Sequence, residues 1–166
     1  MYYLSGKSRT KGLEAESTIL LGAGISAYLN GTLNRARYDS TGLFLANAPK
    51  NTETLGISYQ RQNWDLGFFN KRIGSMWNDN GSANQAVRID PFNISNLYLN
   101  YTIKNESRFS QTKIRLTINN LFDKHSIVAV KPAATTSNLP DPGDQLTMLA
   151  ARSISLSMTF GLAPHR

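Results

Sequence analysis

The chain has 166 residues, enough for one ordinary domain, and it lacks cysteine, which excludes disulfide scaffolds, thiolate zinc sites and thiol catalysis. Eighteen Lys and Arg against eleven Asp and Glu give a formal charge of +7, but the basic residues are scattered and form no run typical of nucleic-acid binding. The sequence has no apolar run long enough for a membrane-spanning helix and no sustained helical periodicity. These patterns predict an all-β fold.

Alternation of apolar and polar residues predicts the first strands. The segment from Leu13 to Leu21 alternates weakly and carries Glu14 and Glu16 on its polar face. Residues 25–34 and 54–60 alternate more regularly, with Ile, Leu and Ala on one side and Ser, Asn, Thr and Gln on the other. Each of these segments is therefore expected to separate an apolar face from a polar face.

The later strands follow the same pattern with one irregularity. In residues 64–77 the alternation breaks at Phe68–Phe69, where we expect a β-bulge. Residues 96–104 and 114–118 alternate again, and residues 152–162 give the clearest pattern of all, with Ser and Thr opposite large apolar side chains. The sequence thus predicts about seven strands.

Short and long connections alternate along the series. The short ones are Gly22-Ala23-Gly24, Gln62-Asn63 and residues 105–109, and the long ones are residues 39–51, 78–92 and 127–147. In an up-and-down meander, every long connection falls at one end of the sheet and every short one at the other. Transmembrane barrels have this asymmetry, with short periplasmic turns and long extracellular loops.

Two further features favour a membrane wall over a soluble sandwich. The polar faces carry mostly amides and hydroxyls, which a wet or plugged lumen tolerates and a dry core does not. Aromatic residues gather near strand ends, as in the two girdles of a barrel. They are Tyr59, Trp64, Tyr101, Phe109 and Phe160 at the short-turn end, and Trp77, Phe92 and Phe122 at the other. We interpret the chain as an antiparallel meander within a transmembrane β-barrel.

One segment departs from simple alternation and resembles a known motif. INNLFDKHS, residues 118–126, begins as a strand and ends in an apolar pair followed by charges. It is similar to the motif that closes the penultimate strand of TonB-dependent outer-membrane receptors at its outer end. Its central residues are Asn120, Leu121, Phe122 and Asp123. The resemblance implies that Leu121 and Phe122 lie at the outer membrane–water interface and that Asp123 begins an extracellular loop.

Other segments resemble the same family, in the family's order. GKSRTKGLEAES is similar to its Gly-hydrophobic-Glu strand start, placed here on Gly12, Leu13 and Glu14. NAPKNTETLGISYQ, then WNDNG with IDPFNISNLYLNYTI, and finally SISLSMTF also resemble family segments. The resemblance therefore extends over essentially the whole chain, and we expect residues 1–166 to be the C-terminal portion of a receptor β-barrel.

The resemblance implies a function and a set of partners. Family members are active-transport receptors in the bacterial outer membrane, most often for ferric siderophores, and their barrels contain 22 strands and an N-terminal plug that contacts TonB. With about seven strands and no plug, the chain is expected to be a fragment that is inactive alone. Outer-membrane lipid and the barrel-assembly machinery, which reads the C-terminal strand, are the other expected partners. The residues that follow Phe160, 161–166, depart from the family, whose chains commonly end at that aromatic.

The sequence offers no convergent chemistry for catalysis. His125 and His165 are isolated from potential metal ligands, and neither a nucleophile elbow nor a phosphate-binding glycine loop occurs. We therefore expect no enzyme activity, no cofactor and no metal site. Ligand-binding residues are unknown at this level, although the loop cations Lys50, Arg88 and Lys131 are compatible with an anionic ligand.

Two alternatives remain open from the residues. A passive outer-membrane porin would show the same strand and loop pattern. A soluble β-sandwich that binds polyanions through its positive charge would instead need a dry core between its sheets and would bind in a salt-dependent manner.

Overall fold

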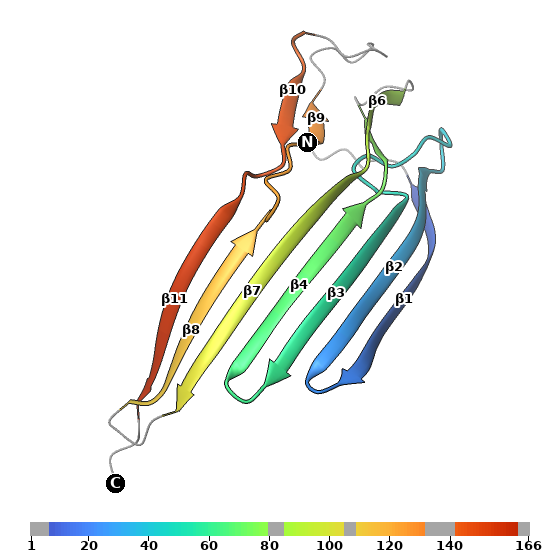
Figure 1. Ribbon diagram of the computed structural model, residues 1–166. Coiled ribbons are helices and arrows are strands. Elements are labelled where there is room, and N and C mark those ends of the chain that lie inside the picture. The colour runs from blue at the N-terminus through green and yellow to red at the C-terminus, as the bar shows by residue number, and fades with distance from the viewer. Residues whose placement is uncertain (1–6, 80–84, 105–108, 132–141, 163–166) are drawn as a thin grey trace.

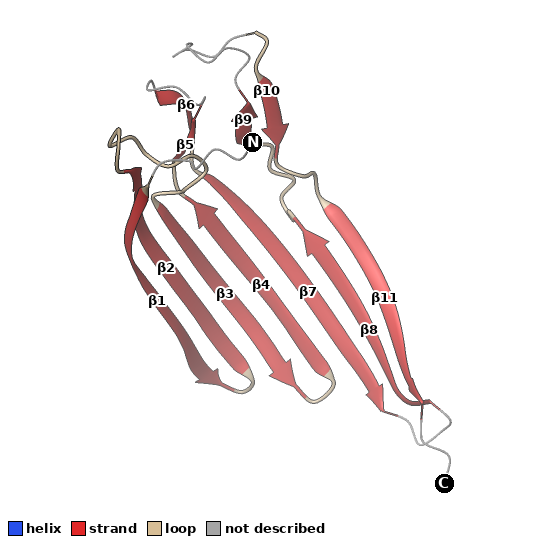
Figure 2. Ribbon diagram, turned by 180° about the vertical axis from the view of Figure 1, so that it is seen from behind, coloured by secondary structure: helices blue, strands red, loops and turns tan. Residues whose placement is uncertain are grey.

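A computed structural model describes residues 7–79, 85–104, 109–131 and 142–162, and their regular structure is entirely β (Figure 2). Seven long strands form one antiparallel sheet in the order β1-β2-β3-β4-β7-β8-β11 (Figure 1). They are β1 (Ser8–Gly22), β2 (Ile25–Tyr38), β3 (Asn51–Arg61), β4 (Trp64–Ile73), β7 (Phe92–Lys104), β8 (Phe109–Asn119) and β11 (Ser153–Leu162). No helix among these residues is suited to crossing a membrane.

Four short strands lie outside the large sheet and form two hairpins. β5 (Met76–Asp79) pairs with β6 (Gln85–Ile89), and β9 (Ile127–Lys131) pairs with β10 (Gln145–Met148). Both hairpins project from the end of the large sheet that lies opposite the tight turns (Figure 1). The prediction that the long connections share one end of the meander is therefore confirmed, and two of them contain strands that the alternation did not reveal.

Tight turns join neighbouring strands at the other end. Ala23 has a φ of 51° between Gly22 and Gly24, which also have positive φ values, and Gln62 has a φ of 55° before Asn63. These left-handed conformations reverse the chain within two or three residues. A side chain at position 24 would also meet the carbonyl oxygen of Gln60 at 2.5 Å. The third short connection, residues 105–108, lies outside the described part of the chain.

The ladder register confirms that each strand separates two kinds of side chain. One continuous row across the sheet consists of Ile19, Ala27, Ile57, Phe68, Leu97, Ile118 and Ile154. The next row on the same face contains Tyr59, Leu66, Leu99, Leu116 and Leu156. The opposite face carries mostly Thr, Ser, Asn and charged residues. The register shows no bulge at Phe68–Phe69, so that expectation was wrong: Phe68 joins the apolar face and Phe69 the polar one.

The apolar face forms a band that runs obliquely to the ladders. On β1 the band begins at Leu13, but on β11 it begins at Ile154, whose ladder row meets β1 at Ile19, six residues further along. Six residues over six strand pairings correspond to a shift of ~3.3 Å for each ~4.8 Å strand spacing, a tilt of ~35°. Strands in transmembrane barrels tilt by ~35–45°. On strands tilted by this angle, an apolar band that is level with the membrane must run obliquely to the ladders.

Buried apolar residues are concentrated at the end of the sheet that carries the long connections, which we call the outer end, rather than along the whole sheet. The core cluster consists of Met76, Ile89, Phe92 and Val130, with Ile73, Val87, Ile94, Val128 and Leu149 packed against it. We call this group the outer-end core. Three of these residues lie on the polar side of the sheet, because their positions in β4 and β7 alternate with those of the apolar face: Ile73, Phe92 and Ile94. The hairpins therefore pack over that side of its outer end.

Candidate functional site

The NLFD motif forms a hydrogen-bonded junction at the outer end of β8. Asn120 is 4% exposed, has a φ of 49° and connects three segments. Its backbone N–H donates to Asn96 Oδ1 of β7 (3.0 Å), and its Nδ2 donates to the carbonyls of Lys124 (3.0 Å) and Ala150 (2.8 Å). Its Oδ1 accepts from the Lys124 N–H (2.9 Å). Asn120 thus fixes the exit from β8 to its neighbours.

Asp123 completes this junction. Its φ is 50°, its N–H donates to the Asn120 carbonyl (2.8 Å), and its Oδ1 accepts from the Arg152 N–H (2.8 Å), just before β11. Short polar side chains such as Asn and Asp tolerate the left-handed backbone at both positions. The motif therefore secures the ends of β8 and β11 around the intervening hairpin, a role that the sequence did not reveal.

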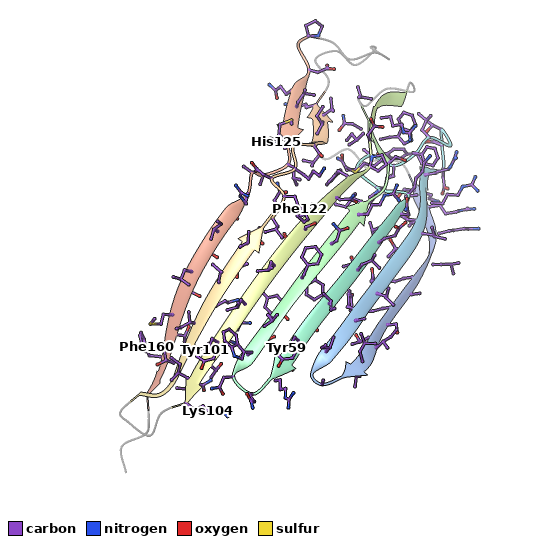
Figure 3. The ribbon with its side chains drawn as sticks, viewed as in Figure 1. Tyr59, Tyr101, Lys104, Phe122, His125 and Phe160 are labelled. Atoms are coloured by element: carbon purple, nitrogen blue, oxygen red, sulfur yellow. The ribbon has the colours of Figure 1, made fainter. Side chains whose placement is uncertain are left out.

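The apolar pair of the motif lies beside the apolar face. Phe122 is 62% exposed, and its ring meets that of Phe68 edge-on at 6.4 Å. The Leu121 N–H donates to the carbonyl of Ser95 on β7 (2.7 Å). Figure 3 shows Phe122 toward the loop end of the sheet. Phe122 extends the apolar face outward, and its placement at the membrane interface stays a prediction.

The second motif, GLE, lies on the outer half of β1. Gly12 is required by packing, because a Cβ there would approach the Leu33 carbonyl oxygen at 2.5 Å. Leu13 is exposed on the apolar face opposite Leu33. Glu14 lies on the polar face, where its Oε1 accepts a hydrogen bond from Asn30 Nδ2 (3.3 Å). The strand thus presents a lipid-compatible side and a wet side in successive residues.

The aromatic residues do not all occupy the expected girdles. Tyr59, Tyr101 and Phe160 lie near the short-turn end (Figure 3), and the Trp64 and Tyr101 rings are 4.5 Å apart there. At the loop end, Phe92 is 8% exposed within the outer-end core, so its assignment to a girdle was wrong. Trp77 packs instead against Phe44 from the connection between β2 and β3. Apolar residues at that end have a protein core to enter.

The connection between β2 and β3 packs against the β5–β6 hairpin through aromatic rings. Phe44 stacks on Trp77 with centroids 6.4 Å apart and planes at 13°. The Arg37 guanidinium carbon lies 4.1 Å and the Lys50 Nζ 4.8 Å from the Phe44 ring centre. Cations over an aromatic face stabilise such a contact. Two of the three long connections are thereby joined.

The candidate ligand-binding cations fall in different places. Arg88 pairs across the β5–β6 ladder with Trp77 and is thus near the ring stack that holds Lys50. Lys131 lies on β9 opposite Gln145, and no described contact connects it to that stack. The structure therefore groups Lys50 and Arg88 around Phe44 and Trp77 but does not bring Lys131 to the same group.

A hollow separates the two hairpins at the outer end. Its volume is about 310 Å³, and its lining combines apolar residues with Arg88, Asp90 and Asp144. Connections on a rigid scaffold commonly carry recognition. In this hollow, side chains from two long connections converge around a space, which makes it the candidate ligand-contacting site.

The polar face carries a line of aromatic residues; alternation places Tyr28 and Tyr98 on that face, but the sequence analysis missed Phe69 between them and the contacts of the three rings. Tyr28 meets Phe69 edge-on at 6.0 Å, and Phe69 stacks with Tyr98 at 6.2 Å. Glycines leave room for the rings, since a Cβ at Gly56 would lie 2.4 Å from Phe69 and one at Gly67 would lie 2.6 Å from Tyr98. The ladder pairs Gly56 with Phe69 and Gly67 with Tyr98, and the sequence analysis predicted no register that would have shown these pairs.

Acidic side chains anchor this aromatic line. Asp65 accepts a hydrogen bond from Asn100 Nδ2 (2.9 Å) and another from the Tyr98 hydroxyl. Glu16 likewise interacts with the Tyr28 hydroxyl. These contacts give the polar face a partly paired surface that suits water or a hydrated partner.

The described residues contain no cluster of metal-ligating side chains. His125 is exposed at the loop end (Figure 3), and His165 lies outside the described residues. In the described part of the chain, no three His, Asp or Glu side chains come together as a metal site would require. The arrangement supports a wall with two different faces and a loop-borne hollow.

Comparisons with known proteins agree with this architecture. A protein-family model described as "TonB dependent receptor-like, beta-barrel" matches residues 1–121. No curated protein matches the chain. The match to the family extends over most of the strands of the large sheet.

Solved structures with the same fold include transport receptors. The ferric-catecholate import receptor Fiu of E. coli K12 has 18% identity and a TM-score of 0.64, over 95% of this chain and 22% of Fiu. The ferric yersiniabactin uptake receptor FyuA of Yersinia pestis has 15% identity and a TM-score of 0.69, over 92% of this chain and 23% of FyuA. The copper transporter OprC has 16% identity and a TM-score of 0.69, over 92% and 23%.

The chain thus spans less than a quarter of the length of these receptors. The meander, the oblique apolar band and the paired short turns and long connections are the features of a barrel wall, and the family match identifies that barrel. The chain belongs to the TonB-dependent receptor-like β-barrel family of the bacterial outer membrane.

Proposed function

We propose that this chain supplies part of the barrel wall and three outer-end connections of a receptor that imports a scarce nutrient across the outer membrane. Ferric siderophores are the ligand class we favour, since receptors of similar fold are named for ferric catecholate and ferric yersiniabactin. The observation that carries the proposal is the hollow between the two hairpins, because it places side chains from separate connections at the outer end of a lipid-facing wall.

The mechanism follows from the two faces of the wall. The apolar face would hold the chain in lipid, and the hairpins would capture the ligand on the outer side. The polar face would line the lumen, where its aromatic line and paired acids would meet a plug that TonB energises. In this proposal, the plug and its TonB contact belong to segments outside this sequence, and the described chain supplies no transport step of its own.

Alone, the chain is expected to be inactive because the sheet is open. In the described chain β1 and β11 form its two edges, so one side of each strand faces no further strand of this sheet. Unpaired backbone groups are costly in lipid, each by several kcal/mol. Additional strands must pair with both edges before the wall can close. The barrel-assembly machinery would recognise β11, its C-terminal strand.

A graft would test the proposal. In a chimera, this chain replaces the equivalent strands of Fiu. Cells that produce the chimera are then assayed for uptake of radiolabelled iron, supplied as ferric catecholate, ferric yersiniabactin or ferric citrate. We expect uptake of at least one chelate that stops when TonB is deleted. Uptake independent of TonB would instead indicate a passive pore. A well-inserted chimera that takes up none of the chelates would contradict the siderophore assignment.

A further inference from the structure

Four basic residues form a cluster at the outer limit of the apolar band. Arg9 lies opposite Arg37 and Lys11 lies opposite Arg35 across the β1–β2 ladder. The next pair on the same face is Leu13 and Leu33, where the band begins. By strand alternation all four cations therefore project from the lipid-facing side, immediately beyond its apolar residues. We call this group the outer basic cluster.

The chain itself neutralises this cluster poorly. Like charges directly opposite each other in a sheet are destabilising. The only described carboxylate paired with the cluster is Asp39, whose Oδ1 lies 3.6 Å from Arg9 Nε in an exposed contact. In the described chain, no side-chain hydrogen bond or ion pair engages Lys11 or Arg35. Two opposed pairs of cations with one carboxylate leave a clear need for an external anion.

The cluster is nevertheless held in place. Arg37 Nη1 donates to the carbonyl of Gly42 (2.7 Å), and its guanidinium lies over the Phe44 ring. A hollow of about 300 Å³ opens among the four cations, and its lining is completed by Tyr38, Asp39 and Gly42. Its size suits a headgroup rather than a macromolecule, and three of its four cations are arginines, whose planar fork matches phosphate oxygens.

We propose that the outer basic cluster binds the phosphate groups of membrane-lipid headgroups. The position decides the source of the phosphate: the cations face outward from the wall, at the level where acyl chains give way to headgroups. A ligand on its way through the lumen would meet the opposite face. Each basic residue near a charged membrane surface adds to the attraction, and Arg–phosphate contacts add geometric selectivity.

A lipid titration tests the proposal. The full 166-residue chain is refolded in zwitterionic micelles and titrated with fluorescent diphosphoryl lipid A, and the same titration uses a lipid A from which both phosphates have been removed. We expect binding only of the phosphorylated lipid. The double variant Lys11→Gln/Arg35→Gln should weaken binding about thirtyfold, because each cation near a charged lipid surface strengthens binding by about five- to sixfold.

Matched variants separate this site from general charge. Lys113→Gln/Arg115→Gln removes the same charge from the polar face of β8 and should leave binding unchanged. Arg35→Lys should retain most of it, and circular dichroism checks that each variant keeps its β content. Equal losses in the two double variants, or equal binding of both lipids, would overturn the proposal. Full competition by inorganic phosphate at the lipid concentration would show a simple anion site and overturn the lipid assignment. A failed uptake chimera leaves these outcomes unaffected.

Discussion

The large sheet and the outer-end core solve the burial of apolar residues in opposite ways. On the sheet, Leu13 is 76% and Leu156 73% exposed, although both belong to the continuous apolar band. In the outer-end core, Ile89 is 2% and Val130 4% exposed. The sheet offers its apolar side chains to lipid, while the hairpins bury theirs against protein because they stand in water. The same chain is thus adapted to lipid on the sheet and to water in the hairpins.

This difference means that a given substitution has different consequences in the two regions. Truncating a side chain in the outer-end core leaves a cavity. On the sheet, truncation merely lets lipid fill the space, whereas a charge is costly there. The two tryptophans allow separate readings, since Trp64 lies on the apolar face beside Tyr101 and Trp77 lies in the outer-end stack with Phe44.

The largest effect is expected from Ile89→Ala in the outer-end core. The vacated space should cost roughly 2–5 kcal/mol of local stability, while Ile89→Val should cost only about 0.5–1.5 kcal/mol. Urea titration of the chain in micelles, read by fluorescence in variants that keep a single tryptophan, checks this. The Trp77 transition should move and the Trp64 transition should not. If both move together, the two regions unfold as one unit and the comparison fails.

Leu156→Arg and its neighbour Ser155→Arg sharpen the contrast between the faces of β11. Both positions are exposed, but Leu156 points to the apolar side and Ser155 to the polar side. In bilayers the first change should cost up to about 2–4 kcal/mol, the cost of Arg on the lipid face of a barrel at the bilayer midplane, and the second far less. Urea unfolding of the receptor chimera in vesicles measures both. Equal costs would mean that the apolar band does not meet lipid.

Asn120→Ala tests the junction between the two regions. It removes the hydrogen bonds to Lys124 and Ala150 and the residue type that tolerates the left-handed backbone, so we expect a loss of about 1–3 kcal/mol. Faster hydrogen exchange at the Lys124 amide should accompany it. Asn119→Ala is the matched control, because exposed Asn119 makes one 3.3 Å bond to Ser153. Comparable losses at the two positions would argue against a special role for Asn120.

Gly56→Ala should have the smallest effect, about 1 kcal/mol, because the new methyl group would press on the Phe69 ring. The double variant with Phe69→Leu should recover part of the loss. A Cβ at Gly31 meets nothing within 4 Å, so Gly31→Ala should be neutral or slightly stabilising. Thermal unfolding of the three variants decides the matter, and a neutral Gly56→Ala would show that the ring moves aside freely.

The sequence was sufficient for the parts of the fold that follow a period of two. Leu97, Leu99 and Tyr101 share a face because alternation imposes it, and the short turns at Ala23 and Gln62 limit the possible pairings to a meander. The hairpins β5–β6 and β9–β10 were not predicted, since their strands of four or five residues are too short to show a period.

Contacts between distant segments could not be predicted from the sequence, for a different reason. Nothing near Asn120 in the sequence indicates that its amide meets Ala150, thirty residues away. The bulge expected at Phe68–Phe69 was wrong because two aromatic neighbours looked like a broken pattern. In the structure, Phe69 serves the polar face by covering Gly56, so a large apolar residue there is compatible with regular pairing.

The oblique course of the apolar band has a consequence for how the loops are arranged around the wall. A strand of eleven residues, such as β8, is about 36 Å long, and a tilt of ~35° carries its outer end ~21 Å sideways. That displacement equals three to four strand spacings measured around the circumference. Each outer-end connection therefore stands over a different sector of the barrel from the one in which its strands begin.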